Sequence, residues 1–416
     1  MNFNSPQNLR NQFIPVKQLL GSLFCFFSLI PWVNFGTNNM DSQPWSVIFA
    51  VGFIFSIIFN VRIPKYLIGI SLVLVIGLLI SVILSVSPSL FSLLRVSFGY
   101  FSIPIIFTAF YNYMKHYGFP FHLFVTVNFV WIFFGILELY YPEVCSSFSP
   151  TRTNFGRGVT SLAAEPTFFG IYLFFNSWII LAAKRFIISR SVGLILLINL
   201  LAVLFLAKSS MVILFFIVVS GSYFWYHFLR VGTRFSKKIL FQTIIVILFL
   251  CISLVTSYNL LEGSRLYSLA NKLLTNVSIV DLVRLDESVN GRVEALLFSS
   301  FGMVNNYFIP GGLDTFSDTK AALISDHANG YFYVWVKGDK IMSWVGSHFY
   351  ELGIFGIVAL LLFYLFLCDG SRLSRINLIT MFVILFSAIP IGFSLIPMLF
   401  AVLAFNKQVF LYNPKI

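Results

Sequence analysis

The sequence predicts an all-α polytopic membrane protein with about twelve transmembrane helices, or eleven on an alternative count. Hydrophobic residues fill 58% of its 416 positions and charged residues only 10%, whereas a soluble domain carries about 25% charged residues. Apolar runs long enough to cross a hydrocarbon core of about 30 Å recur along the chain, for example at 66–86, 121–140 and 240–258. The 51 Phe and 18 Tyr residues suit a lipid-facing surface with aromatic side chains near its interfaces.

Polar breaks between the apolar runs define the individual spans. The expected spans are 17–35, 45–60, 66–86, 91–112, 120–141, 164–183, 191–207, 209–229, 238–257 and 346–367, followed by an apolar stretch at 376–406. Pro390, Gly392 and Pro397 interrupt this last stretch, so we expect two short helices there. The predicted organisation is therefore helices one to nine in 1–258, a large extracytoplasmic loop in 259–345, and helices ten to twelve with a cytoplasmic C-terminus in 346–416.

Basic residues occupy alternate breaks between these spans. They are Arg10, Lys17, Arg62, Lys65, Lys115, Lys184, Arg185, Arg190, Arg230, Arg234, Lys237, Lys238, Arg372 and Arg375. Because cytoplasmic loops carry an excess of Lys and Arg, this alternation predicts a cytoplasmic N-terminus. Twelve spans also place Lys407 and Lys415 in the cytoplasm, which favours twelve over eleven. The net charge of +12 is thus largely a topology signal, and no nucleic-acid partner is expected.

The sequence predicts neither a metal site nor a cofactor. Its four cysteines form no CxxC motif and no Cys/His cluster, so neither a disulfide framework nor a structural zinc is implied. Asp314 and Asp318 have a spacing that could hold a divalent cation, but a solvated turn is the preferred interpretation.

A short outer segment before the sixth span carries the first candidate anion site. Arg157 lies between Gly156 and Gly158, so the backbone can turn tightly and approach a ligand. Arg157 offers a bidentate fork to a phosphate at the membrane surface. Pro166 suits the first turn of the span, and Glu165 would lie at the positive end of that helix and orient Arg157. A helix cap with an interfacial arginine is the alternative interpretation.

Two further basic residues, Lys208 and Arg95, lie outside the alternating basic breaks. Lys208 lies in a turn so short that its charge sits at the membrane edge, and snorkelling to the interface is the alternative to a ligand-binding role. Arg95 lies inside the fourth span, where an ionisable residue is costly and indicates a functional site. Glu138, near the outer end of span five, is a candidate partner.

The large outer loop contains two polar clusters. Asn290-Gly291-Arg292 precedes an apolar stretch that ends at Pro310-Gly311-Gly312, and Arg265 lies further upstream. Asp326 precedes His327, the only histidine of the loop. An acid beside a histidine can set its tautomer and raise its basicity, so this pair is a candidate general base. A solvated loop surface is the alternative for each of these residues.

Combined, these features resemble the O-antigen polymerase (Wzy) and O-antigen ligase superfamily of bacterial envelope glycosyltransferases. The resemblance rests on Arg157-Gly158 through Glu165-Pro166, on Lys208-Ser209-Ser210, on Arg292 through Pro310-Gly311-Gly312, and on His327-Ala328-Asn329 followed by Glu351-Leu352-Gly353-Ile354. The family pattern commonly places Asn directly after His, whereas Ala328 intervenes in this chain. His348 is therefore the alternative to His327 as the family histidine.

The resemblance implies a GT-C-type enzyme in the bacterial inner membrane that transfers glycan from undecaprenyl diphosphate, inverting and independent of metal. Arg157, Arg292, Arg265, Lys208 and Glu165 would then form the diphosphate site, with His327 and Asp326 as the catalytic pair. Partners would be the lipid-linked oligosaccharide, the bilayer and a chain-length regulator. A polymerase is preferred over a ligase that uses lipid A-core as acceptor, and a flippase for the same lipid is the alternative from another class.

Overall fold

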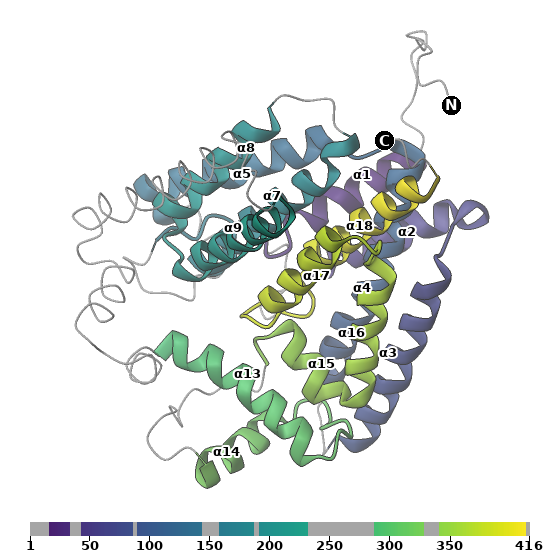
Figure 1. Ribbon diagram of the computed structural model, residues 1–416, viewed down its shortest axis with the longest axis vertical. Helices are drawn as coiled ribbons and strands as arrows, with labels where there is room; N and C mark the ends of the chain where they lie inside the picture. Colours follow the sequence, from purple (N-terminus) through teal and green to yellow (C-terminus); the bar gives the residue numbers. More distant parts are fainter. Residues whose placement is uncertain are drawn as a thin grey trace.

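The computed structural model describes residues 16–33, 43–85, 90–143, 158–186, 191–231, 287–327 and 341–412. All regular structure in these residues is helical (Figure 1). The helices are α1 Val16–Ser28, α2 Trp45–Ser56, α3 Lys65–Leu84, α4 Leu90–Tyr117, α5 Phe121–Tyr140, α7 Pro166–Ala182, α8 Val192–Ala202, α9 Ser210–Val231, α13 Glu287–Asn305, α14 Phe316–His327, α15 Trp344–Leu352, α16 Ile354–Leu367, α17 Arg372–Leu385 and α18 Leu395–Tyr412. The predicted all-α class is therefore confirmed over the described residues.

Several of these helices have the character of membrane helices. Three are long and apolar enough to cross a bilayer, at Lys65–Leu84, Leu93–Tyr117 and Phe121–Tyr140. Shorter apolar helices are Val16–Ser28, Trp45–Ser56, Pro166–Ala182, Val192–Ala207, Ser210–Tyr226, Ile354–Leu367 and Leu395–Val409. Only 33% of an apolar 18-residue stretch of α3 is buried within the molecule, and large side chains such as Leu72, Leu79 and Ile83 are exposed. Such an apolar exterior fits lipid rather than water as the surrounding medium.

Aromatic side chains fill the centre of the helix bundle. Trp32, just after α1, stacks between Phe168 of α7 and Phe393, with ring centroids 5.2 and 5.1 Å away. Trp131 of α5 stacks on Tyr172 of α7 at 4.3 Å. Rings of this size bury large areas in fixed geometries, so they hold α1, α5, α7 and the start of α18 in one arrangement.

A buried chain of amides joins α5, α7 and α8. Asn176 donates to Asn128 Oδ1 at 2.7 Å, Asn128 donates to Asn199 Oδ1 at 2.7 Å, and Asn199 donates to Ser177 Oγ at 2.8 Å. Polar pairs of this kind between membrane helices contribute about 0.6 kcal/mol each. The chain thus stabilises the α5–α7–α8 unit, and we assign it no chemistry.

The basic breaks lie together at one end of the bundle. Arg62 and Asn112 of α4 exchange two hydrogen bonds, from Arg62 N at 2.9 Å and to Arg62 O at 3.0 Å. Asn406 of α18 donates to Ala182 O at the end of α7 at 2.9 Å, and Lys407 donates to Phe366 O at the end of α16 at 2.8 Å. Tyr66 at the start of α3 also stacks on Phe366, with ring centroids 5.9 Å apart, so the breaks near residues 62, 184, 370 and 407 lie at the same end.

The helix boundaries correct one predicted span and confirm another prediction. The span expected at 346–367 is wrong as a single helix, because Gly353 (φ 55°, ψ −129°) separates α15 from α16. A Cβ at Gly353 would overlap the Phe308 carbonyl, so the break depends on glycine. The two helices expected in 376–406 are confirmed as α17 and α18, separated by 386–394. The span expected at 238–257 lies outside the described residues.

The second half of the predicted outer loop is helical. Helix α13 lies beside α15, and α14 lies beside α13, at the lower end of the view in Figure 1. A small apolar core joins these three helices through Phe298, Phe316, Leu323, Ile324, Ile341 and Tyr350. Glu294 of α13 also forms an ion pair with Lys320 of α14, with side chains only 2% and 9% exposed. The predicted boundary at 346 therefore falls within α15 and not between two independent units.

Candidate functional site

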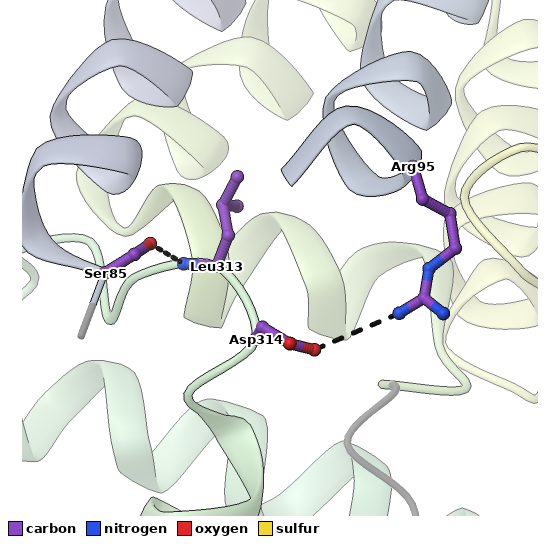
Figure 2. A network of polar contacts seen from close by, with 4 residues as sticks. All are labelled: Ser85, Arg95, Leu313 and Asp314. Atoms are coloured by element: carbon purple, nitrogen blue, oxygen red, sulfur yellow. Dashed lines mark hydrogen bonds and ion pairs between the residues drawn. The ribbon is translucent and has the colours of Figure 1, made fainter. Parts of the chain in front are cut away.

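The loop between α13 and α14 is attached to the ends of α3 and α15. Gly311 N donates to Tyr350 O at 2.8 Å, and Ile354 N donates to Phe308 O at 2.8 Å. Leu313 N donates to Ser85 Oγ, one residue after α3, at 2.7 Å (Figure 2). Two motifs that the sequence singled out separately, Pro310-Gly311-Gly312 and Glu351-Leu352-Gly353, are thus in contact.

This loop also contains unusual backbone conformations. Tyr307, Phe308 and Asp314 have φ values of 54°, 65° and 65°, in the left-handed region that non-glycine residues seldom adopt. Each such residue costs on the order of 1–3 kcal/mol unless its surroundings hold it, and such residues concentrate at functional sites. Tyr307 is 86% exposed, so its ring does not contribute to the packing of the loop.

Arg95 of α4 faces the loop and not the end of α5. Its Nη2 lies 3.9 Å from Asp314 Oδ1, and the two side chains are 26% and 28% exposed (Figure 2). The expected pairing with Glu138 is wrong, because the Glu138 carboxylate accepts from Thr160 N at 2.8 Å and from Ser161 N at 2.6 Å. A partly exposed pair stabilises a fold by only about 0–1 kcal/mol, so the guanidinium can turn to another anion at small cost.

Glu351 lies deeper in the same region, at the end of α15. Its Oε2 accepts a hydrogen bond from the Tyr100 hydroxyl of α4 at 2.6 Å, and the residue is 9% exposed. Burial raises the pKa of Glu351 to about 7, the hydrogen bond from Tyr100 lowers it, and Asp314 and Arg95 act in opposite directions. A carboxyl group with a pKa near neutrality can both accept and release a proton at pH 7.

His348 is enclosed one turn before Glu351. Its Nδ1 lies 2.8 Å from Trp344 O, so Nδ1 carries the proton and Nε2 is the acceptor. The ring packs against Trp344 at 4.2 Å and edge-on to Tyr100 at 5.3 Å, and burial lowers the pKa of His348 to about 4. His348 is therefore neutral at pH 7, and it is too deeply buried in this structure to meet a substrate.

A second group forms around the turn between α8 and α9. Helix α8 ends in a π-helical turn, Val203–Ala207, and Lys208 follows with φ 47°. Val159 N donates to Leu206 O at 2.9 Å, and a Cβ at Gly158 (φ 120°) would overlap the Ala207 carbonyl. The chain directly after Arg157 is thus held against the Lys208 turn.

Glu165 occupies the N-cap position of α7, and Pro166 is the first residue of that helix. The predicted helix start is therefore confirmed. The Glu165 side chain forms no capping hydrogen bond. Arg157 itself, which Glu165 was expected to orient, lies outside the described residues, as does Arg265.

Residues 290–292 belong to α13, so Arg292 projects from a helix. Arg292 is half-buried on this helix. His327 is the last residue of α14 and Asp326 precedes it; their side chains lie outside the described part of the structure.

No metal site is formed by the described residues, since none of their His, Cys, Asp and Glu side chains gather in groups of three. Asp314, the first of the two aspartates at the weak cation spacing, lies 3.9 Å from the Arg95 guanidinium. Tyr100 was not identified from the sequence, because it lies in an apolar run where a tyrosine carries no signal of its own.

No known protein family, curated protein or solved structure matches the chain. Its chemistry must therefore be inferred from the geometry of its own residues. The described site combines one partly exposed guanidinium, one buried carboxyl with a pKa near 7 and a strained loop, all at the ends of apolar helices.

Proposed function

We propose that this chain is a membrane glycosyltransferase that polymerises undecaprenyl-diphosphate-linked oligosaccharide units into O-antigen or a related polysaccharide. The observation that carries the proposal is the contact between the 308–314 segment and α15, beside Arg95. It joins two segments of the superfamily resemblance into one polar site where α3 ends and α4 begins. A long prenyl tail can lie along these apolar helices while its diphosphate meets the polar site.

The described groups supply what such a transfer needs. The acceptor hydroxyl oxygen bonds to the anomeric carbon as the bond from that carbon to the diphosphate oxygen breaks. Negative charge then develops on the leaving undecaprenyl diphosphate, and a positioned guanidinium such as Arg95 stabilises it near a low-dielectric boundary. The hydroxyl proton passes to a base, either Glu351 or His327. Tyr307 offers an exposed ring on which a sugar can stack.

The proposed topology has twelve spans with the basic end of the bundle in the cytoplasm. The contacts of Arg62 with Asn112, of Asn406 with Ala182 and of Lys407 with Phe366 support it, because basic loops favour the cytoplasmic side. The Glu351 end then lies outside, where the lipid-linked units are joined. Cysteine labelling from outside that reached position 234 and missed position 318 would overturn this topology.

A flippase for the same lipid is the alternative from another class. Transporters place charged and polar groups near the midplane of their spans. Among the described residues, the buried acidic and basic side chains are Glu294, Lys320, His348 and Glu351. None of them lies in the three long candidate spans. The charged residues of those spans, Lys65, Arg95, Lys115 and Glu138, are each among the first or last three residues of their span, which favours an enzyme with its site at the membrane surface.

The lipopolysaccharide of a deletion strain tests the proposal. Loss of a polymerase leaves one repeat unit on each core, whereas loss of a ligase leaves none. We expect single repeats, and a full ladder after return of the wild-type gene. An unchanged ladder in the deletion strain would exclude polymerase and ligase activity.

A further inference from the structure

A cavity of about 470 Å³ lies at the other end of α16 from Gly353. It is bounded by the ends of α7, α16, α17 and α18 and by Tyr223 of α9. Since α16 has 14 residues and each adds about 1.5 Å, the cavity is about 20 Å from the Glu351 site along the helix axis. It is therefore separate from the site of the proposed chemistry.

The lining of the cavity has two chemical characters. One part is apolar, with Trp178, Leu181 and Leu403. The other is polar and basic, with Lys184, Lys407 and Asn377. An apolar wall beside a basic rim is the surface that the upper acyl chain and the phosphate of a phospholipid need.

The two lysines are available for an anion. Lys407 Nζ donates to Phe366 O at 2.8 Å and to Leu365 O at 3.4 Å, which leaves one of its three N–H groups. Lys184 is exposed, and no ion pair or hydrogen bond of its side chain occurs among the described residues.

The one carboxylate of the cavity does not neutralise them. Asp369 Oδ1 accepts from Ser371 N at 2.8 Å, and Asp369 N donates to Ser374 Oγ at 3.2 Å. Asp369 thereby fixes the turn into α17, and within the described residues it forms no ion pair with Lys184 or Lys407. The cavity keeps a net positive charge.

We propose that this cavity binds the phosphate headgroup of an anionic glycerophospholipid from the leaflet opposite the Glu351 site. Lys184 and Lys407 hold the phosphate, and the first acyl carbons lie against Trp178 and Leu181. Basic pockets between membrane helices on the cytoplasmic side are typical sites for such headgroups. The proposal needs only the membrane character of the helices and does not depend on the glycosyltransferase assignment.

Titration of the purified full chain in detergent with phosphatidylglycerol, followed by native mass spectrometry and thermal unfolding, tests the site. The wild type is expected to bind phosphatidylglycerol in preference to phosphatidylcholine. Lys184→Gln is expected to weaken phosphatidylglycerol binding about fivefold, since one basic side chain near anionic lipid contributes on that order. Lys65→Gln is the control, because Lys65 also lies at the basic end but does not line the cavity.

Lys184→Gln keeps the proposal testable even if Lys407→Gln fails to fold, because Lys407 also holds the end of α16. Equal binding of the two lipids by the wild type would overturn the proposal, and so would unchanged binding by Lys184→Gln. A parallel titration of the wild type with inorganic phosphate distinguishes a lipid from a soluble ligand. If inorganic phosphate stabilises the wild type as much as phosphatidylglycerol does, the ligand is a soluble phosphate compound and the lipid assignment is wrong.

Discussion

Glu351→Gln is the substitution that separates catalysis from stability at the candidate site. Gln has nearly the same shape and keeps an acceptor for the Tyr100 hydroxyl, but it cannot take a proton at pH 7. If Glu351 is the base, polymerisation should slow by about 10²–10⁴-fold, the usual contribution of a general base. Wild-type activity should rise with pH around 7, because the base works in its deprotonated form.

Glu351→Gln should raise the thermal stability of the protein at alkaline pH, although it lowers the activity. The pKa of Glu351 is raised from 4.5 to about 7, mainly by burial. An acid with a raised pKa in the folded state stabilises the fold below pH 4.5, and this stability is lost as pH rises toward 7. The difference corresponds to about 3 kcal/mol above pH 7. Glu351→Gln removes this cost, so the variant should unfold at a higher temperature than wild type at pH 8 and at a similar one at pH 4.

The assay is polymer formation by purified protein from lipid-linked repeat units, with thermal unfolding of the same samples. Asp318→Asn is the matched control, because Asp318 is an exposed carboxylate in the first turn of α14. It should leave both measurements unchanged. Normal polymerisation by Glu351→Gln would refute its role as base, and loss of both activity and stability would make Glu351 a structural residue.

Four other substitutions test the candidate site and the fold. Arg95→Lys should reduce polymerisation roughly tenfold or more, because an ammonium cannot copy a bidentate fork; full activity would show that Arg95 does not hold the diphosphate. If His327 is the base, His327→Ala should slow polymerisation by about 10²–10⁴-fold. His348→Ala should chiefly lower the melting temperature, because the ring of His348 is enclosed. An inactive but stable His348→Ala variant would show that His348, and not His327, is the base. Gly158→Ala should destabilise the protein by about 1–3 kcal/mol in thermal unfolding, because Gly158 has a positive φ and a Cβ there would overlap the Ala207 carbonyl. Gly221→Ala is the control, because a Cβ at Gly221 meets no other atom within 4 Å. Equal stability of the two variants would contradict the described turn.

Much of the helical framework could be predicted from the sequence. The spans expected at 66–86, 120–141 and 164–183 agree with α3, α5 and α7 to within two residues, because charged residues or proline bound these apolar runs. The break at Gly353 could not be predicted in this way, since both of its neighbours, Leu352 and Ile354, are apolar. It is produced by a distant segment, residues 308–310, packing against that glycine.

The candidate site could be predicted only in its parts. The glycine-rich loop and the Glu351-Leu352-Gly353 motif stood out as motifs, but nothing in the sequence indicated that they touch each other. Glu138 was the partner of Arg95 suggested by the sequence, and only its hydrogen bonds to the backbone at Thr160 and Ser161 exclude it. Pairings across hundreds of residues depend on tertiary packing, which periodicity does not encode.

The central claim is tested most directly by incubating the purified chain with undecaprenyl-diphosphate-linked repeat units alone and measuring the product by gel and mass spectrometry. The account predicts lipid-linked chains of two or more repeats with release of undecaprenyl diphosphate. It also predicts that substitution of the base, Glu351→Gln or His327→Ala, slows formation of this product by about 10²–10⁴-fold, whereas Asp318→Asn does not. Absence of any polymer in this incubation, together with transfer of the repeat unit when lipid A-core is added in a parallel incubation, would contradict the polymerase assignment.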